Sequence, residues 1–443
     1  MYSGLFTDLY QLTMCQAYWR EGMDAPATFS LFSRKLPEQR NYLVACGLDD
    51  ALSFLETVRF DAPALEYLES LGLFAPQFLE WLGNFRFRGD VRAVPEGSPV
   101  FANEPLLEVT APITQAQLVE TGVMNHVHVQ TVLASKAARV VAAAGGRRVV
   151  DFGMRRTHGV DAAMRGARAF HVAGVAATSN VAAARKYGLE ATGTMAHSYI
   201  QAHADELHAF EAFAALYPQT VLLVDTYDTL AGVEHVIAMA KRLGERFRVR
   251  AIRLDSGDLE QLARRARERL DAAGLTHVQI FASGGLDEYA VAALVDADAP
   301  INGFGVGTGM GVSKDAPALD MAYKLVEYGG EGRLKTSASK AIYPGRKQVF
   351  RRFEADVAVG DIIARVDEQH SGQPLLEPVM QGGQRLPAGQ QDITRARQRC
   401  AAATAALPPE VRAIERAASP YPVGFSPALE ADRQTLIKRF AGE

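Results

Sequence analysis

The chain has 443 residues, which is more than one ordinary domain needs and enough for two sizeable hydrophobic cores. Hydrophobic residues make up 48% and charged residues 22%, the composition of a globular protein in water. The formal net charge of −4 gives no reason to expect nucleic acid or an anionic membrane as a partner.

Cysteine spacing and the start of the chain exclude further classes of protein. Cys15, Cys46 and Cys400 are far apart and form no CxxC pair, which argues against a disulfide framework or a structural zinc site. The N-terminus lacks the basic start and long apolar run of a signal peptide, and no stretch of about 18 apolar residues indicates a membrane span. We therefore expect a cytoplasmic enzyme or binding protein.

The first part of the chain, up to about residue 110, mixes short strands with helices and turns. Strands are expected over residues 27–32, 91–94 and 106–109. Further along, His126 and His128 have the spacing of one face of a strand and could be interpreted as a metal pair. No third ligand is apparent and a helical segment follows, so packing or capping is the favoured interpretation.

Strands and helices alternate in the middle of the chain. Short strands are predicted over residues 148–152, 220–225, 249–255, 278–283 and 303–307, and a helix over 259–273. Successive strand ends, from Asp225 to Gly307, are 30, 28 and 24 residues apart, which is the period of βα units. Such units predict a parallel sheet, either open or closed into a barrel.

Polar segments follow these predicted strands, and a further short strand is expected to end in the GTMAHS segment at His197. They are DFGMRRTHG (151–159), GTMAHS (193–198), DTYDT (225–229), LDSGD (254–258), SGGLD (283–287) and GVGTG (305–309). Ligands bind at the carboxyl ends of the strands in both open parallel sheets and barrels. One or two such segments would be ordinary turns, but six in sequence predict an enzyme site.

The last hundred residues differ from the middle. Residues 345–385 are predicted to form strands and loops, and helices are expected over 395–405 and 427–440. We expect the two ends of the chain to form one domain around the barrel.

Several motifs, taken in order, resemble those of nicotinate phosphoribosyltransferases. They are TDLYQLTM (7–14), FSRKLP (32–37), QTVLASKAAR (130–139), DFGMRRTHG (151–159), ATSNVAAARKYG (177–188), GTMAHSYIQAH (193–203), LVDTYDT (223–229), IRLDSGDL (252–259) and PGRKQVFR (344–351). The set covers roughly residues 5–385. No single motif decides the assignment, but the ordered set is highly specific.

The resemblance implies a fold and a reaction. The implied fold is that of type II phosphoribosyltransferases: an irregular or incomplete α/β barrel, here residues 111–344, and a flanking α/β sandwich domain, here residues 1–110 with 345–443. The implied enzyme joins nicotinate to 5-phosphoribosyl-1-pyrophosphate in NAD salvage, giving nicotinate mononucleotide and pyrophosphate. Coupled ATP hydrolysis, as in an ATP-dependent ligase, a requirement for Mg²⁺, and a homodimer with shared active sites are implied as well.

Three residues carry the implied chemistry. A neutral imidazole can attack a γ-phosphoryl group, and the resemblance makes His197 the phosphorylated residue and Asp225 the acceptor that fixes its tautomer. Positive charge builds on the ribose as pyrophosphate leaves, which calls for a nearby carboxylate. By resemblance Asp255 contacts the ribose or its Mg²⁺, whereas Asp258 is equally well explained as a helix N-cap. Taken alone, His197 would more often be a structural histidine.

Four residues are implied for nicotinate. By resemblance Phe152 stacks on one face of the pyridine ring, the partner subunit's Tyr10 stacks on the other, and Arg253 faces the carboxylate. Phe152 alone would more often be core packing. Ser179 stands where the related nicotinamide enzyme has an Asp, and a carboxylate there would repel nicotinate. Ser179 therefore indicates the acid as substrate.

Glycine turns and cations are implied for the phosphates. By resemblance the two glycine segments hold the 5′-phosphate through Gly284, Gly285, Gly307 and Thr308. Arg155 is the predicted phosphate contact among the cations, because adjacent arginines at a strand end repel one another unless an anion lies there.

Basic residues outside the barrel are also candidates for the pyrophosphate site. The resemblance places the partner subunit's Arg34 there, with Lys340 and Lys347 as similar candidates. Charged loop residues are usually just solvated, so a pyrophosphate contact and a solvated surface position are both open for these residues. His158 either touches ligand phosphates or makes a loop hydrogen bond.

Two other functions remain open. Within the same fold the chain would be a nicotinamide or quinolinate phosphoribosyltransferase, although Ser179 disfavours nicotinamide and quinolinate enzymes lack the GTMAHS histidine. In a different class it would be a non-catalytic nucleotide-binding barrel protein, although Arg155, His197 and Asp255 are all present.

Overall fold

The computed structural model describes residues 3–336 and 342–441 and divides into two compact units. The first unit contains Met1–Ser135 and Ala318–Glu443, and the second contains Lys136–Pro317. These boundaries differ from the predicted ones at 110/111 and 344/345. The strand β12 (Met321–Tyr328) belongs to the first unit because it pairs antiparallel with β1 (Pro26–Ser33), a partner almost 300 residues away that local sequence patterns do not reveal.

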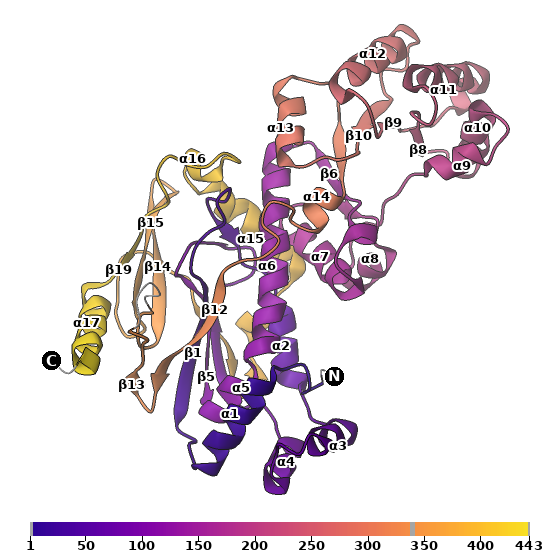
Figure 1. Cartoon of the computed structure of the whole chain (residues 1–443). Helices are drawn as coiled ribbons and strands as arrows, with labels where there is room; N and C mark the ends of the chain where they lie inside the picture. Colours follow the sequence, from indigo (N-terminus) through magenta and orange to yellow (C-terminus); the bar gives the residue numbers. More distant parts are fainter. Residues whose placement is uncertain (1–2, 337–341, 442–443) are drawn as a thin grey trace. The chain divides into compact units, whose positions relative to one another are not determined.

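The second unit is built on a parallel sheet with the strand order β7–β6–β11–β10–β9–β8. The sheet is curled into a half barrel and is not closed (Figure 1). The prediction of an incomplete α/β barrel is therefore confirmed. Each strand predicted in the middle of the chain is present: β6 (Arg148–Asp151), β8 (Val221–Leu223), β9 (Ala251–Leu254), β10 (Gln279–Ala282) and β11 (Gly303–Val306), with β7 (Ala177–Thr178) at one edge.

These strands are short and mostly apolar, as expected where both faces of a parallel sheet are covered by protein. Ile252, Ile280 and Phe304 are completely buried, as expected of strands in the middle of a parallel sheet. The helices α10, α11 and α12 pack side by side in chain order (Figure 1). The helices of this unit are α7 (Val160–Val172), α8 (Val181–Tyr187), α9 (His197–Gln201), α10 (Glu206–Leu216), α11 (Thr229–Leu243), α12 (Leu259–Ala272), α13 (Glu288–Asp296) and α14 (Thr308–Gly311), with the 3-10 helices η1 (Met154–Arg156) and η2 (Gly244–Arg246).

Aspartates begin several of these helices. The carboxylate of Asp258 accepts a hydrogen bond from the Gln261 N–H at 3.1 Å and caps α12. Of the two interpretations of Asp258, the structure supports the N-cap. Asp228 caps α11 in the same way.

The first unit contains a seven-stranded and a four-stranded sheet. The seven-stranded sheet is antiparallel, and the stacked rings of Phe29 and Tyr323, 4.8 Å apart, join two of its strands. Its order is β13 (Glu331–Gly332), β12, β1, β5 (Pro105–Pro112), β3 (Asp90–Ala93), β17 (Glu377–Gln381) and β18 (Gln384–Arg385). The other sheet has the order β16 (Gln373–Pro374), β14 (Lys347–Glu354), β15 (Val357–Arg365) and β19 (Val423–Phe425), and β2 (Leu43–Val44) pairs with β4 (Pro99–Val100).

The strands and helices predicted near both ends of the chain are therefore present. The long helix α6 (Glu120–Ala143) begins in the first unit and ends in the second. Within the described ranges, no helix is both long and apolar enough to span a membrane. The other helices of the first unit are α1 (Leu9–Arg20), α2 (Leu48–Thr57), α3 (Ala62–Ser70), α4 (Pro76–Gly83), α5 (Ile113–Leu118), α15 (Ile393–Ala405), α16 (Pro409–Arg412) and α17 (Pro427–Ala441), with the 3-10 helix η3 (Pro387–Gly389).

A buried ion pair crosses the hairpin of β14 and β15. The guanidinium of Arg351 lies 2.6 Å from the Asp361 carboxylate, and both side chains are at most 4% exposed. The Tyr421 hydroxyl donates to the same carboxylate at 2.9 Å. The pKa of Glu104 is raised by burial and by the nearby Asp361. Arg351 is therefore the cation that compensates two buried acidic groups.

We expect Arg351→Met to lower the free energy of unfolding by about 3–5 kcal/mol, because it leaves Asp361 buried without its cation. Arg351 lowers the pKa of the buried Glu104, so its removal should raise that pKa further. A raised pKa of an acidic group in the folded chain costs stability as the pH rises, so the loss should be larger at pH 8 than at pH 5. Urea denaturation at the two pH values measures both effects. Arg264→Met, at an exposed pair with Glu260, is the control and should cost at most about 1 kcal/mol.

Candidate functional site

A cavity of about 330 Å³ lies at the carboxyl ends of the strands in the second unit. It is lined by side chains and turns that follow β6, β9, β10 and β11. Predicted site residues in its lining are Phe152, Arg155, Arg253, Asp255, Gly284, Gly285, Gly307 and Thr308. The parallel sheet thus brings together residues that are more than 150 positions apart in the sequence.

Arg253 lies at the centre of the polar contacts in this cavity. Its guanidinium donates to Asp255 at 2.6 Å, to the Ser283 hydroxyl at 2.8 Å and to the Thr194 hydroxyl at 2.8 Å. The guanidinium carbon also lies 5.3 Å from the centre of the Phe152 ring, a cation–π distance. The structure therefore places a fixed cation beside an aromatic ring, as expected for binding an aromatic acid.

Asp255 follows β9 and is half-buried. Burial raises its pKa, but hydrogen bonds from Ser283 and Arg253, together with the nearby His197, lower it below the usual value overall. The group is therefore a carboxylate at neutral pH.

Asp225 holds the backbone that carries Asp255. Its carboxylate accepts hydrogen bonds from the Asp255 N–H at 2.8 Å and from the Ser256 hydroxyl at 2.7 Å. Asp225 is buried and lies just after β8. It therefore fixes the turn after β9 that carries Asp255 and Ser256.

His197 is the first residue of α9, not the end of a strand as predicted. Its Nδ1 lies 3.1 Å from the Thr226 hydroxyl, and its Nε2 lies 3.9 Å from the Asp255 carboxylate. The structure thus places the Thr226 hydroxyl beside the His197 ring nitrogen, where Asp225 was expected, and one carboxylate oxygen of Asp225 is bonded to the Asp255 loop instead. Thr226 was not predicted, although its position next to Asp225 in the DTYDT segment is a usable signal.

The glycine turn after β10 requires its glycine. Gly284 has a φ of +90°, and a Cβ there would lie 1.7 Å from the Asp255 carbonyl oxygen. Within β11, a Cβ on Gly305 would lie 2.4 Å from the Phe152 ring. The first glycine turn and the end of β11 therefore pack closely, backbone first, against their neighbours.

The two arginines of η1 line the same cavity and are exposed. Arg156 donates to the Thr308 hydroxyl at 3.1 Å.

Asp151, which was not predicted as a site residue, accepts hydrogen bonds from the Gly153 N–H and the Thr178 hydroxyl, both at 2.7 Å. Burial raises the pKa of Asp151. Asp151 therefore fixes the start of the turn that presents both arginines.

Other predicted residues of the described part of the chain are not in the lining of this cavity. Ser179 follows β7 and donates its backbone N–H to the Asp151 carbonyl at 2.9 Å, but it is not among the residues that line this cavity. In the first unit, Tyr10 is 48% exposed on α1, and Arg34 pairs with Asp320 at 2.9 Å. Lys340 lies outside the described residues.

Lys347 is buried in the first unit. Its ammonium lies 3.3 Å from Glu108 and donates to the Gly345 carbonyl at 2.7 Å. The structure therefore gives it a packing role rather than the ligand contact considered from the sequence.

His126 and His128 both lie within α6, not on a strand. Two residues apart on a helix, they point in different directions, which removes the basis for a metal pair. The His128 Nε2 accepts a hydrogen bond from the Leu319 N–H at 2.9 Å, and burial lowers its pKa. The favoured packing or capping interpretation is confirmed for His128.

Metal binding at the site would use substrate oxygens. The described residues contain no group of three or more His, Cys, Asp or Glu side chains arranged to hold a metal ion. Mg²⁺ is commonly held by one or two carboxylates together with substrate phosphates and water. The ionised Asp255 at the cavity fits that requirement.

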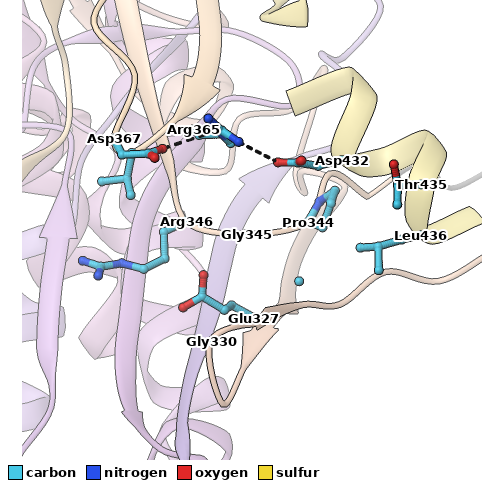
Figure 2. A pocket seen from close by; sticks show the side chains of 12 residues that line it. Glu327, Gly330, Pro344, Gly345, Arg346, Arg365, Asp367, Asp432, Thr435 and Leu436 are labelled. Carbon is cyan, nitrogen blue, oxygen red and sulfur yellow. Dashed lines mark ion pairs between the residues drawn. The ribbon is translucent and has the colours of Figure 1, made fainter. Parts of the chain in front are cut away.

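The first unit contains a separate cavity of about 570 Å³ that the sequence did not predict (Figure 2). Arg365 lies between Asp367, at 3.4 Å, and Asp432, at 3.6 Å (Figure 2). Arg365 is therefore held by two carboxylates on this wall.

The chain is similar to known proteins over most of its length. Residues 5–128 match the model of the nicotinate phosphoribosyltransferase (NAPRTase) N-terminal domain, and residues 147–336 match that of the NAPRTase family. The chain is 58% identical to a nicotinate phosphoribosyltransferase of Mycobacterium tuberculosis over 98% of this chain and 93% of that protein. It is 41% identical to that of Bacillus subtilis over 84% of this chain and 78% of the relative.

A solved structure shows the same architecture. The crystal structure of human nicotinic acid phosphoribosyltransferase has a TM-score of 0.87 and 29% identity, over 97% of this chain and 99% of the human chain. Both family models and the near-full-length relatives lead to one conclusion: the chain belongs to the nicotinate phosphoribosyltransferase family.

Proposed function

We propose that the cavity of the second unit transfers the phosphoribosyl group of 5-phosphoribosyl-1-pyrophosphate to nicotinate in NAD salvage, and that ATP hydrolysis is coupled through phosphorylation of His197. Family membership supports the transfer reaction. The single observation that carries the assignment of the site is the contact set of Arg253, which joins an aromatic ring, an ionised carboxylate and a glycine turn in one cavity.

Each part of the cavity matches one part of the proposed substrates. The Phe152 ring offers an apolar face for the pyridine ring, and Arg253 offers a cation for its carboxylate. The Asp255 carboxylate stabilises the positive charge that develops on the ribose as the bond to pyrophosphate breaks. The backbone of the glycine turns and Arg155 bind phosphate oxygens. When bound, Mg²⁺ would neutralise charge on the departing pyrophosphate.

The geometry around His197 supports its proposed phosphorylation. If the Nδ1–H is donated to the Thr226 hydroxyl oxygen, the Nε2 keeps its lone pair for attack on a γ-phosphoryl group. That Nε2 faces Asp255. A phosphoryl group there would bring negative charge to the side where pyrophosphate and Mg²⁺ are proposed to bind, which links the ATP step to the transfer step.

We further propose a cytoplasmic homodimer in which each subunit completes the site of the other. The partner subunit's Tyr10 would cover the second face of the pyridine ring, which its exposure in this chain supports. The partner subunit's Arg34 would bind pyrophosphate, and Lys340 remains a candidate for the same role.

His197→Ala should abolish acid-labile label from γ-labelled ATP and leave a slower, ATP-independent transfer, because the base and sugar sites are unchanged. Thr226→Val should slow labelling roughly tenfold, the value of one lost hydrogen bond. The measurement is phosphoprotein labelling together with nicotinate mononucleotide formation. His208→Ala, at an exposed histidine of α10, is the matched control. Label that persists in His197→Ala would remove this residue from the mechanism.

Ser179→Asp tests the proposed choice of nicotinate. If Ser179 faces the bound base, the new carboxylate should repel that of nicotinate and lower kcat/KM by at least about tenfold, while nicotinamide gains relative to it. Steady-state rates with each base measure the ratio, and Ser179→Ala controls for loss of the hydroxyl. If the ratio of the rates with the two bases is unchanged, residues other than Ser179 determine the choice of base. Ser179 is not among the residues that line the cavity, so this outcome is consistent with the structure.

A further inference from the structure

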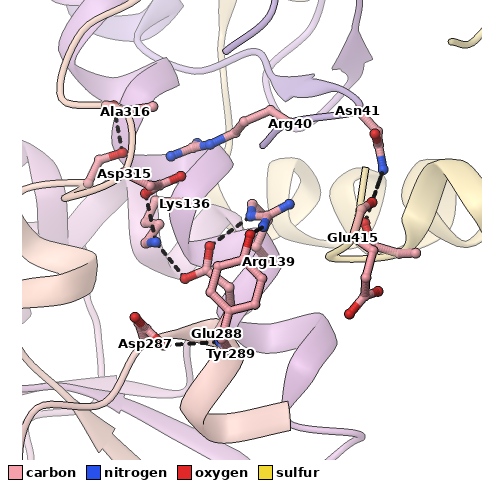
Figure 3. A network of polar contacts seen from close by, with 12 residues as sticks. Arg40, Asn41, Lys136, Arg139, Asp287, Glu288, Tyr289, Asp315, Ala316 and Glu415 are labelled. Carbon is pink, nitrogen blue, oxygen red and sulfur yellow. Dashed lines mark hydrogen bonds and ion pairs between the residues drawn. The ribbon is translucent and has the colours of Figure 1, made fainter. Parts of the chain in front are cut away.

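A buried network of charges in the second unit lies outside the lining of the proposed active site. The ammonium of Lys136, on α6, is 2.5 Å from the Glu288 carboxylate and 2.7 Å from that of Asp315 (Figure 3). Arg139, one helical turn further along α6, donates to the other oxygen of Glu288 at 2.8 Å. Lys136 is 2% exposed and Glu288 is fully buried.

Each carboxylate of this network lies in the segment that follows one of the two glycine turns. Glu288 is the first residue of α13, three residues after Gly285, and Asp287 caps that helix through the Tyr289 and Ala290 N–H groups. Asp315 follows α14, the helix that begins at Thr308. One ammonium group, that of Lys136, therefore forms ion pairs with the segments that follow both turns.

The two turns also touch one another directly. A Cβ on Gly309 would lie 2.9 Å from the Leu286 carbonyl oxygen, so the second turn packs closely on the first. The Lys314 N–H donates to the Gly309 carbonyl at 3.2 Å, which joins the neighbour of Asp315 to the same turn. A shift of either carboxylate would therefore be transmitted to both turns.

Stability alone does not require this network. Replacing a buried ion pair by well-packed apolar side chains is often neutral or stabilising, because desolvating the charges offsets their attraction. A direct contact with substrate is also excluded, since Lys136 is buried and does not line the cavity. What the ion pairs add over apolar contacts is a defined position for each partner.

We propose that Lys136 is a positioning residue, which through Glu288 and Asp315 sets the two glycine turns at the spacing that binds the 5′-phosphate. This proposal rests on the proposed function, which assigns that phosphate to these turns. Small displacements of binding groups can reduce rates and affinities strongly. Weakening the network should therefore affect the sugar phosphate more than the base.

The test uses the whole chain of 443 residues, with ribose 5-phosphate as the probe. We expect Lys136→Met and Glu288→Gln each to raise the Kd for ribose 5-phosphate roughly tenfold in titration calorimetry, and the KM for 5-phosphoribosyl-1-pyrophosphate similarly. The KM for nicotinate should change less than about twofold. Because Lys136 acts through Glu288, the double variant should lose less affinity than the product of the two single losses.

Arg351→Met is the matched control, since it breaks an equally buried ion pair in the first unit. It should lower the melting temperature without changing the Kd for ribose 5-phosphate. Glu288→Gln keeps the size of the side chain and serves if Lys136→Met fails to fold. A folded Glu288→Gln or Lys136→Met protein that binds ribose 5-phosphate like the wild type would overturn the proposal, and so would a wild type that does not bind it.

The failure of the proposed function would look different. A wild type that binds ribose 5-phosphate but forms no nicotinate mononucleotide would contradict the proposed reaction. The comparison of Kd values between the wild type and the Lys136 variants would then still decide whether the network positions the turns.

Discussion

The hydrogen bonds that Asp225 accepts from Asp255 and Ser256 are the interaction on which the site depends. They join the turn after β8 to the turn after β9, and they face Asp255 toward Arg253 and His197. Asp225 is buried, so its hydrogen bonds are made where competing water is excluded. Without them the Asp255 carboxylate would lose the fixed position that its contacts require.

This arrangement also fixes the charge states in the cavity. The contacts of Ser283 and Arg253 keep the pKa of Asp255 low, so the group carries a charge and no proton at neutral pH. In the proposed reaction it therefore acts by charge alone and not as a general acid. Arg253 has neighbours on three sides, which holds the guanidinium over Phe152 before any base binds.

The regular βα period allowed the strands and the strand-end residues to be predicted, because in a parallel sheet position along the chain determines position at the site. What depends on pairing between distant segments could not be predicted: β12 joins β1, which moves the domain boundaries. The partner of His197 also depends on contacts between distant segments. Asp225 and Thr226 are adjacent polar residues in DTYDT, and only the direction of the backbone determines that Thr226 contacts the histidine. His126 and His128 were ambiguous because a short apolar run fits a strand or a helix.

The distribution of paired and exposed cations indicates where an anion is to bind. Lys136 and Arg351 are buried and held by carboxylates, whereas Arg155 is exposed at the cavity. In the proposed dimer the partner subunit's Arg34 adds a second cation, which must first leave its Asp320. That pair is partly exposed to solvent, at 25% and 39%, and such pairs contribute about 0–1 kcal/mol. A pyrophosphate with several negative charges can therefore displace Asp320 at little cost, whereas it could not compete for the buried cations.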